Sequence, residues 1–233
     1  MKKVGIVTII GYTNYGNILQ NYATQEVIKD LGFHAVTIDN SVEPTALSIK
    51  LPFSKLTILR KKIYKWIHRK RIKEQRALDR QKEKVFRDFK DTHIEHTEYC
   101  ISENNVPDGL GDSFYCFVTG SDQVWNPYYR LGSGIDFLTF APPSKRIAYA
   151  PSFGISEIPE VVREQFGVWL KEMHRLSVRE ESGARIIKEL TGRDAPVLID
   201  PTLMLTKEKW LAIAKEVPTK PKKYLLTYFL GTV

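Results

Sequence analysis

Polar residues that could bind a sugar follow an apolar run at 114–118. Asp122, Gln123 and Trp125 place a carboxylate, an amide and an indole close together in the chain. Carboxylates and amides form hydrogen bonds with hydroxyl groups, and an aromatic ring offers a flat apolar surface to a sugar ring. We therefore interpret this segment as a sugar-binding loop. An Asp placed after a strand is also a common helix N-cap, so that structural role remains open for Asp122.

A second polar segment, 11–17, follows the apolar run at the start of the chain and leads into an expected helix. The N-terminus of a helix attracts anions and hydroxyl oxygens because its first N–H groups are unpaired. The segment matches neither GxGxxG nor a P-loop, so it does not predict a nucleotide site. Gly and Asn are also ordinary turn residues, so a simple connecting loop is the alternative.

Three further loops carry side chains that could take part in chemistry. Tyr149 and Ser152 follow one apolar run, Arg179 follows another, and Asp200 follows a third. A guanidinium at the start of a helix is unfavourable beside the helix dipole unless an anion lies between them, which would suit a phosphate. The alternatives are an ordinary ion pair of Arg179 with the glutamates that follow it, and a domain hinge at 200–201.

Alternating strands and helices are expected to position these loops. We predict strands at 3–10, 33–39, 114–118, 145–150, 176–178, 197–199 and 224–230, and helices at 17–31, 56–84, 156–173, 180–191 and 206–215. Ser177 and Glu180 match a capping box, and Gly32 suits a helix C-terminus. The alternation predicts a doubly wound parallel α/β sheet. Ligands bind such sheets beyond the carboxyl ends of the strands, so the polar loops should meet at one edge.

The composition excludes several classes of protein. With 42% hydrophobic and 27% charged residues, the chain of 233 residues is typical of a globular protein. Its two cysteines lack CxxC spacing, and His93 and His96 have no neighbouring cysteine or carboxylate cluster, so we expect no disulfide framework and no metal site. No apolar stretch approaches the ~18 residues of a membrane span, and the start lacks a signal-peptide cleavage site. We expect a cytoplasmic protein.

The positive charge is concentrated in one segment. Residues 55–90 contain 15 Lys and Arg against 4 Asp and Glu, a net charge of +11, and the rest of the chain is slightly acidic. Apolar residues at 56–67 form a stripe along the expected helix, which favours peripheral contact with an anionic membrane surface. A helix with a solvated basic face is the alternative. The segment has few aromatic residues and no nucleic-acid-binding motif, so we expect no nucleic acid partner.

Five motifs occur in order along the chain: GYTNYGNILQNYATQEVIKDLG, VTGSDQVWNP, RIAYAPSFG, LSVREESG and LIDPTLML. In this order and spacing they closely resemble the polysaccharide pyruvyltransferase family. The resemblance covers about residues 4–205 and continues faintly into YLLTYFLG. It implies a Rossmann-like first half of a two-domain, glycosyltransferase-B-like architecture, with two such halves around a cleft.

The resemblance also implies a reaction and a set of site residues. Members of the family transfer the enolpyruvyl unit of phosphoenolpyruvate to a sugar, forming a pyruvate ketal and releasing phosphate. Phosphoenolpyruvate is the implied donor substrate, with no further cofactor, and a sugar or lipid-linked saccharide is the implied acceptor in cell-envelope exopolysaccharide synthesis. The implied catalytic residues are Asp122 and Arg179. The implied substrate-binding residues are Asn14, Tyr15, Asn17, Gln20, Ser121, Gln123, Trp125, Tyr149 and Ser152.

The second half of the family carries a motif resembling DSFHG, which has no counterpart in this sequence. We therefore expect residues 1–205 to form the acceptor-side domain, residues 206–233 to begin a truncated second domain, and the chain to be incomplete for catalysis. The alternative is a non-catalytic carbohydrate-binding remnant of such an enzyme.

An enzyme of this family would work at the inner face of the membrane, where segment 55–90 would make contact.

Overall fold

The structure is a computed structural model of the chain. It describes residues 1–11, 14–45, 47 and 69–215, together with residues 223, 225 and 227. The side chains of 69–75 are outside the description. The apolar stripe expected at 56–67 and the strand expected at 224–230 also lie outside the described residues, apart from the two isolated positions 225 and 227.

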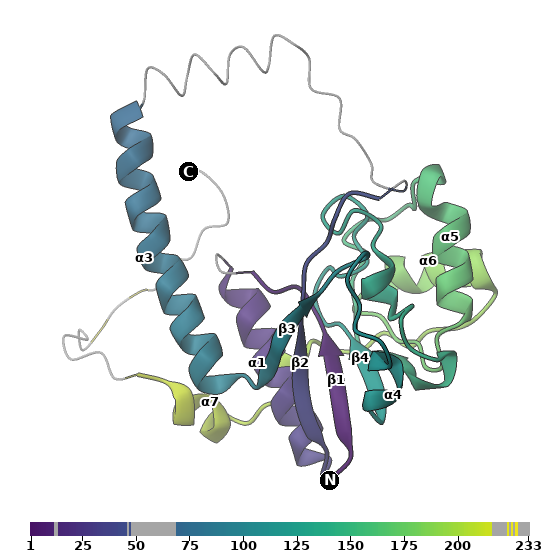
Figure 1. Cartoon of the computed structure of the whole chain (residues 1–233), viewed down its shortest axis with the longest axis horizontal. Helices are drawn as coiled ribbons and strands as arrows, with labels where there is room; N and C mark the ends of the chain where they lie inside the picture. Colours follow the sequence, from purple (N-terminus) through teal and green to yellow (C-terminus); the bar gives the residue numbers. More distant parts are fainter. Residues whose placement is uncertain are drawn as a thin grey trace.

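A five-stranded parallel sheet forms the centre of the molecule, in the order β3-β2-β1-β4-β5 (Figure 1). The strands are β1 (Lys3–Val7), β2 (His34–Asn40), β3 (His96–Ile101), β4 (Cys116–Thr119) and β5 (Arg146–Ala148). Beyond β5, single parallel bridges join Ile147 to Arg175 and Val178 to Val197. The expected strands at 176–178 and 197–199 are therefore reduced to one bridge, although both segments lie where the prediction placed them.

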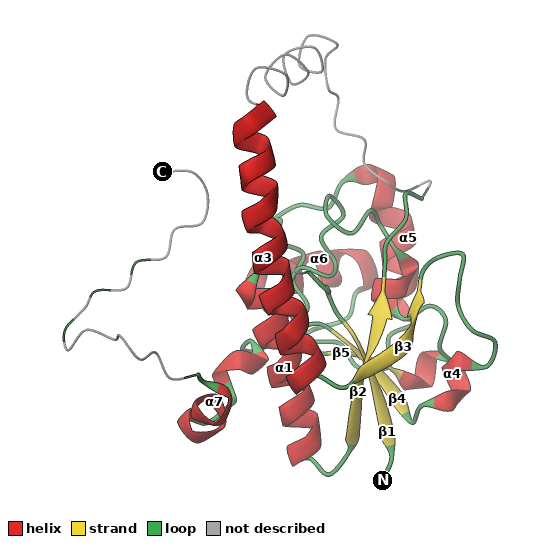
Figure 2. Ribbon diagram, turned by 60° about the vertical axis from the view of Figure 1, so that its left-hand side comes forward, coloured by secondary structure: helices red, strands yellow, loops and turns green. Residues whose placement is uncertain are grey.

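Helices flank both faces of the sheet, which confirms the doubly wound α/β class (Figures 1 and 2). One side carries α1 (Tyr15–Asp30), α3 (Arg69–His93) and α7 (Lys207–Ile213), and the other carries α4 (Leu110–Ser113), α5 (Glu160–Lys171) and α6 (Glu181–Thr191). Three short 3-10 helices, η1 (Gly134–Phe137), η2 (Pro143–Lys145) and η3 (Pro201–Leu203), lie in the connections.

The strand pattern explains this arrangement. In β1, Val4 and Ile6 point to the α1 side, whereas Val7 points to the side of α5 and α6. Both faces of the strand are apolar, as expected for a parallel strand covered on both sides. Position 5 requires a glycine, because a Cβ there would lie 2.8 Å from atoms of Ile38 and Phe117.

Two details of the sequence prediction were wrong. Strand β3 was not predicted, because its inward residues include Thr97 and three successive residues are exposed, so it carries no apolar run. The capping box was also wrong. Helix α6 begins at Glu181 with Glu180 at the N-cap, and the Ser177 hydroxyl instead accepts from Ala150 N and donates to Ala148 O.

Helix α3 projects past the sheet (Figures 1 and 2). Its C-terminal part packs on α1, with the rings of Phe86 and Tyr15 4.7 Å apart and Phe89 against Tyr22. Tyr15 is the first residue of α1, which starts at the carboxyl edge of the strands. At ~1.5 Å per residue, Arg76 lies roughly 15 Å beyond Phe86, so the basic half of α3 rises beside that edge.

Candidate functional site

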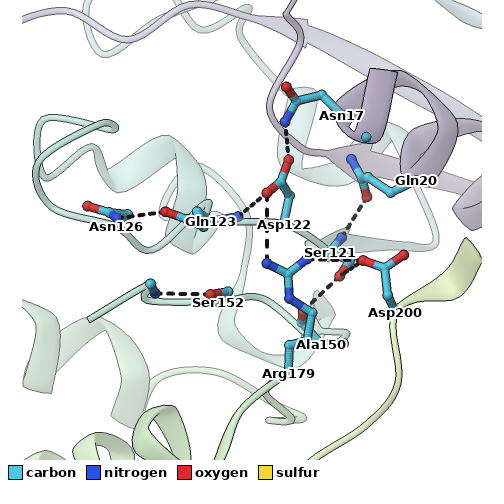
Figure 3. Close-up of polar contacts among 12 residues, drawn as sticks. Asn17, Gln20, Ser121, Asp122, Gln123, Asn126, Ala150, Ser152, Arg179 and Asp200 are labelled. Atoms are coloured by element: carbon cyan, nitrogen blue, oxygen red, sulfur yellow. Dashed lines mark hydrogen bonds and ion pairs between the residues drawn. The ribbon is translucent and has the colours of Figure 1, made fainter. Parts of the chain in front are cut away.

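The predicted site loops meet at the carboxyl edge of the sheet (Figure 3). Asp122 follows β4, Ser152 follows β5, and Arg179 follows the bridge residue Val178. Asn17, in the first turn of α1, faces Asp122. The expected convergence of these loops is therefore observed.

The Asp122 carboxylate is held in place by its own loop and by α1. Asn17 Nδ2 donates a hydrogen bond to Oδ2, and Gln123 N donates to Oδ1 at 2.7 Å. The backbone carbonyl of Asp122 accepts from Ser152 N at 2.7 Å, which joins the loops after β4 and β5. Within the described chain, the next helix begins at Gly134, so Asp122 is not a helix N-cap.

The Arg179 guanidinium lies between two carboxylates. Its Nη1 donates to Asp200 Oδ2 at 3.1 Å, while its Nη2 lies 3.9 Å from Asp122 Oδ1. About a third of the side chain is exposed, at 31%. The alternative pairing with the following glutamates is not what the structure shows for Glu180, whose carboxylate instead accepts from Ser152 Oγ and Phe153 N.

Asp200 lies in one of the loops that the sequence singled out, but it was not among the implied catalytic or substrate-binding residues. Its Oδ1 accepts from the backbone N of Thr202 at 3.0 Å and from the Thr202 hydroxyl at 2.8 Å, and its Oδ2 accepts from Ser121 Oγ at 2.9 Å. Burial alone would raise the pKa of Asp200, but hydrogen bonds from Thr202, Ser121 and Arg179 outweigh it and hold the pKa below its usual value. The carboxylate is therefore charged at neutral pH.

A buried layer of hydrogen bonds supports these charged groups. Gln20 Nε2 donates to Thr8 Oγ1 at 2.6 Å, and Gln20 Oε1 accepts from Ser121 N at 3.0 Å. Ser121 Oγ also lies 2.9 Å from the carbonyl of Ala150. Gln20, Ser121 and Thr8 are almost fully buried, so this layer fixes the ends of β1, β4 and β5 relative to one another. Their burial favours a supporting role beneath the charged groups.

Three of the predicted substrate-binding residues lie farther out. Asn14 caps α1 by accepting from Gly16 N at 2.8 Å, and Tyr15 is 52% exposed beside Phe86. The Tyr149 ring lies on the α1 face of the sheet, and its hydroxyl donates to Ile199 O at 3.1 Å. Burial, followed by the charge of Asp200, raises the pKa of the Tyr149 phenol.

Trp125 corrects the expectation of a sugar-stacking platform. The indole is fully buried, stacks on Phe137 with ring centroids 5.3 Å apart, and donates from Nε1 to the carbonyl of Asp136 at 3.1 Å. It has no face available to a sugar. The aromatic ring instead ties the Asp122 loop to the core, and Gln123 accepts from Asn126 Nδ2 at 2.8 Å within the same loop.

A buried ion pair also stabilises the connection between β4 and β5, which contains the Asp122 loop. Arg130 Nη2 and Nε donate to the two carboxylate oxygens of Asp136 at 2.7 and 2.8 Å, and Nη2 also donates to Asn40 Oδ1 at 2.8 Å. Burial raises the pKa of Asp136, while its contacts with Arg130 act in the opposite direction. The sequence carried no motif for this pair, whose partners lie in a loop and in the short helix η1.

A family model for polysaccharide pyruvyl transferase matches residues 14–232, a range that includes Asn17, Asp122, Arg179 and Asp200. The chain belongs to the polysaccharide pyruvyl transferase family. No curated protein and no solved structure matches the chain. Membership makes a sugar the expected kind of acceptor, and the amide, hydroxyl and carboxylate groups at the sheet edge have the chemistry to bind one.

The charged groups at this edge of the sheet do not balance one another. One guanidinium faces two carboxylates, so the three groups carry a net negative charge.

Among the described residues, no group of three or more His, Cys, Asp or Glu side chains could hold a metal ion. In the same part of the chain, no helix has both the length and the apolar character needed to cross a bilayer.

Proposed function

We propose that the chain provides the acceptor side of a pyruvyl transferase that moves the enolpyruvyl unit of phosphoenolpyruvate to a sugar in cell-envelope polysaccharide synthesis. Residues 1–205 would form the acceptor-side domain, and 206–233 would begin a second domain of glycosyltransferase-B-like type. The family match and the meeting of Asp122 with Arg179 at the carboxyl edge of the sheet support this proposal.

The reaction needs a carboxylate near the reacting carbon. Protonation of C3 of phosphoenolpyruvate places positive charge on C2, and one sugar hydroxyl oxygen bonds to C2. A second hydroxyl oxygen then replaces the phosphate, which completes the ketal. Of the two hydroxyl protons, one balances the proton gained by C3 and the other leaves with the phosphate. Asp122 is suited to stabilise the positive C2 and to accept a hydroxyl proton.

Release of phosphate requires cationic partners, and Arg179 is the candidate within this site. Because Arg179 already faces two carboxylates, it can offset little of a phosphate's charge on its own. We therefore expect this polypeptide alone to release no steady phosphate from phosphoenolpyruvate in the presence of acceptor saccharides. Steady release that depends on both substrates would contradict the division into acceptor-side and donor-side halves.

Acceptor binding tests the proposal directly. Titration of the chain with a panel of envelope saccharides, followed by calorimetry, should find at least one ligand whose binding is lost in Asp122→Ala. Asp112→Ala is the matched control, because Asp112 is an exposed carboxylate in α4 with a surface contact to Lys145. If Asp122→Ala and Asp112→Ala bind the panel equally well, the site is wrongly assigned. Saccharide binding without transfer under any condition would instead favour the carbohydrate-binding remnant.

The projecting half of α3 is the proposed contact with the inner face of the membrane, where a lipid-linked acceptor would be presented. Arg76, Arg80 and Lys84 are exposed and spaced four residues apart, and Leu78 and Val85 are exposed apolar residues on the same helix. Electrostatic attraction of ~1 kcal/mol per basic residue supports reversible binding. Residues Lys61, Lys62 and Lys65, within the segment of the expected apolar stripe, lie outside the described residues.

Vesicle sedimentation tests this contact. The chain should bind vesicles that contain phosphatidylglycerol more strongly than neutral vesicles at low salt, and reversal of Arg76, Arg80 and Lys84 to Glu should weaken the difference. The control reverses Lys171, Arg185 and Lys188, which are exposed on α5 and α6 across the sheet. Equal binding to anionic and neutral vesicles would exclude the membrane contact.

A further inference from the structure

The two carboxylates that face Arg179 differ in their surroundings (Figure 3). Asp200 accepts a hydrogen bond from Nη1 at 3.1 Å, whereas the closest approach of Asp122 to the guanidinium is 3.9 Å, beyond hydrogen-bond range. We propose that Asp200 is a positioning residue that holds Arg179, and that this leaves Asp122 as the carboxylate that meets substrate.

Asp200 is bonded as a structural carboxylate would be. It accepts from the Thr202 amide and hydroxyl, from the Ser121 hydroxyl and from Arg179, so both of its oxygens are engaged. These donors come from the loop after β4, from η3 and from the segment before α6. A carboxylate that is bonded from three directions keeps one orientation, and its charge is stabilised by each donor.

Asp122 is held differently. Its side chain accepts from the Asn17 amide and from its neighbour Gln123 N, both uncharged donors. Arg179 lies close enough to interact with its charge but does not hydrogen-bond to it. The two carboxylates therefore have different roles. Asp200 provides the counter-ion of the guanidinium, and Asp122 keeps capacity for a further donor, such as a sugar hydroxyl.

Removing the Asp200 charge should release Arg179. In Asp200→Asn, the guanidinium loses its hydrogen-bonded counter-ion, and Asp122 is the other carboxylate of the described chain that forms an ion pair with it. Arg179 would then compete with substrate for Asp122. The role given to Asp122 rests on the proposed function, whereas the placement of Arg179 by Asp200 does not, so the two can be tested separately.

Arginine modification measures the placement of Arg179 without any substrate. The full chain is treated with phenylglyoxal, and the labelling of each arginine is followed by mass spectrometry. Labelling of Arg179 should be several-fold faster in Asp200→Asn than in the unaltered chain and unchanged in Asp122→Asn. Arg163, which is 34% exposed and paired with Glu189, serves as the internal reference. Glu172→Gln is the matched control, because it neutralises the partner of Arg146 at a distant ion pair.

Faster labelling in Asp200→Asn could also arise if the substitution loosened η3 and so exposed Arg179. The variant Thr202→Val separates this explanation from loss of the Asp200 charge. That variant removes the threonine hydroxyl bond to Asp200 but keeps the charge. Faster labelling in Asp200→Asn alone supports the proposal. Equal increases in Thr202→Val and Asp200→Asn, or an increase in Asp122→Asn that matches that of Asp200→Asn, would overturn it.

Saccharide affinity provides the second readout. With a ligand from the calorimetric panel, Asp200→Asn should lower affinity about tenfold, which equals about 1.4 kcal/mol. The same change in an Arg179→Ala background should have no effect, because the competing guanidinium is gone. An equal loss in both backgrounds would overturn the positioning role. If the unaltered chain binds no saccharide, the proposed function fails, and the labelling result still decides the role of Asp200.

Discussion

The two faces of the sheet are covered to different extents. On the side of α5 and α6, Phe117, Phe137 and Phe166 are fully buried in one continuous core that also contains Trp125. On the other side, α1 covers β1 and β2, while a wholly apolar cavity of about 350 Å³ lies open over β4 and β5, with Cys116 in its lining. We refer to these as the closed face and the open face.

The site takes its support from the closed face. Trp125 and the Arg130–Asp136 pair fix the Asp122 loop to the large core. The open face contributes the rim, where η3 packs against α1 and carries Asp200 at its start. Asp122, the carboxylate proposed to meet substrate, is therefore anchored on the more densely covered side of the sheet, and its partner Arg179 is held through the less covered side.

The largest expected difference between the faces is in the cost of truncating a side chain. Phe137→Ala should lower the free energy of unfolding by ~3–5 kcal/mol, because the ring is fully buried and its neighbours cannot collapse into the space. Ile147→Ala, in the lining of the open cavity, should cost only ~1–2 kcal/mol, because the side chain is already partly exposed. Urea unfolding of both variants measures the difference.

Leu31→Ala is the control for this pair, because Leu31 is 69% exposed on the rim of the cavity and should change stability little. An equal loss of stability in Phe137→Ala and Ile147→Ala would show that the open face is as tightly packed as the closed one.

The sequence predicted the fold well where a strand is apolar on both faces. Segment 3–10 contains β1, segment 33–39 covers all of β2 except its last residue, and the helix predicted between them ends before Gly32, whose φ of 83° suits a helix C-terminus. Strand β3 escaped prediction because an edge strand has one neighbour and tolerates polar residues. The identity of its inward residue, Thr97, gives no hydrophobic signal.

The candidate site was predicted less completely, for a physical reason. The order of strands brings the loops together, and this could be inferred from alternation alone. Which side chains face the ligand depends on packing within each loop. Trp125 looked suited to a sugar but turns into the core, and Asp200 looked like a hinge but accepts a hydrogen bond from the Arg179 guanidinium. Sequence patterns do not encode these orientations.

The alkylation rates of the two cysteines test whether the cavity on the open face is accessible to solvent. Cys116 is partly buried in the cavity, and burial raises the pKa of its thiol, an effect that Lys145 reduces. Because the thiolate is the reactive form, alkylation of Cys116 in the native chain should become efficient only at a higher pH than is usual for a free cysteine. Cys100 is exposed and acts as the internal reference for access of the reagent.

Mass spectrometry of the alkylated chain over a range of pH gives both rates. Reaction of Cys116 only after denaturation, with normal reaction of Cys100, would mean that the cavity is covered in solution. The contrast between the two faces would then be wrong.

The smallest expected effect concerns Asp200, on the rim of the open face, and is a change in the free energy of unfolding at acidic pH. Asp200 has a pKa below its usual value of 3.8 when folded, so its hydrogen bonds stabilise the folded chain above that pH and are lost as the pH falls through the lower, folded pKa. Asp200→Asn lacks this contribution at every pH. The difference in unfolding free energy between the two chains should therefore be constant near neutrality and shrink below about pH 4. Urea unfolding between neutral pH and about pH 2.5 measures it. Asp194→Asn is the control, because that side chain is 91% exposed and should show no such change. A difference that grows as the pH falls would mean that the folded chain raises the pKa of Asp200, and the hydrogen bonds that hold η3 at the site would then not favour the charged carboxylate.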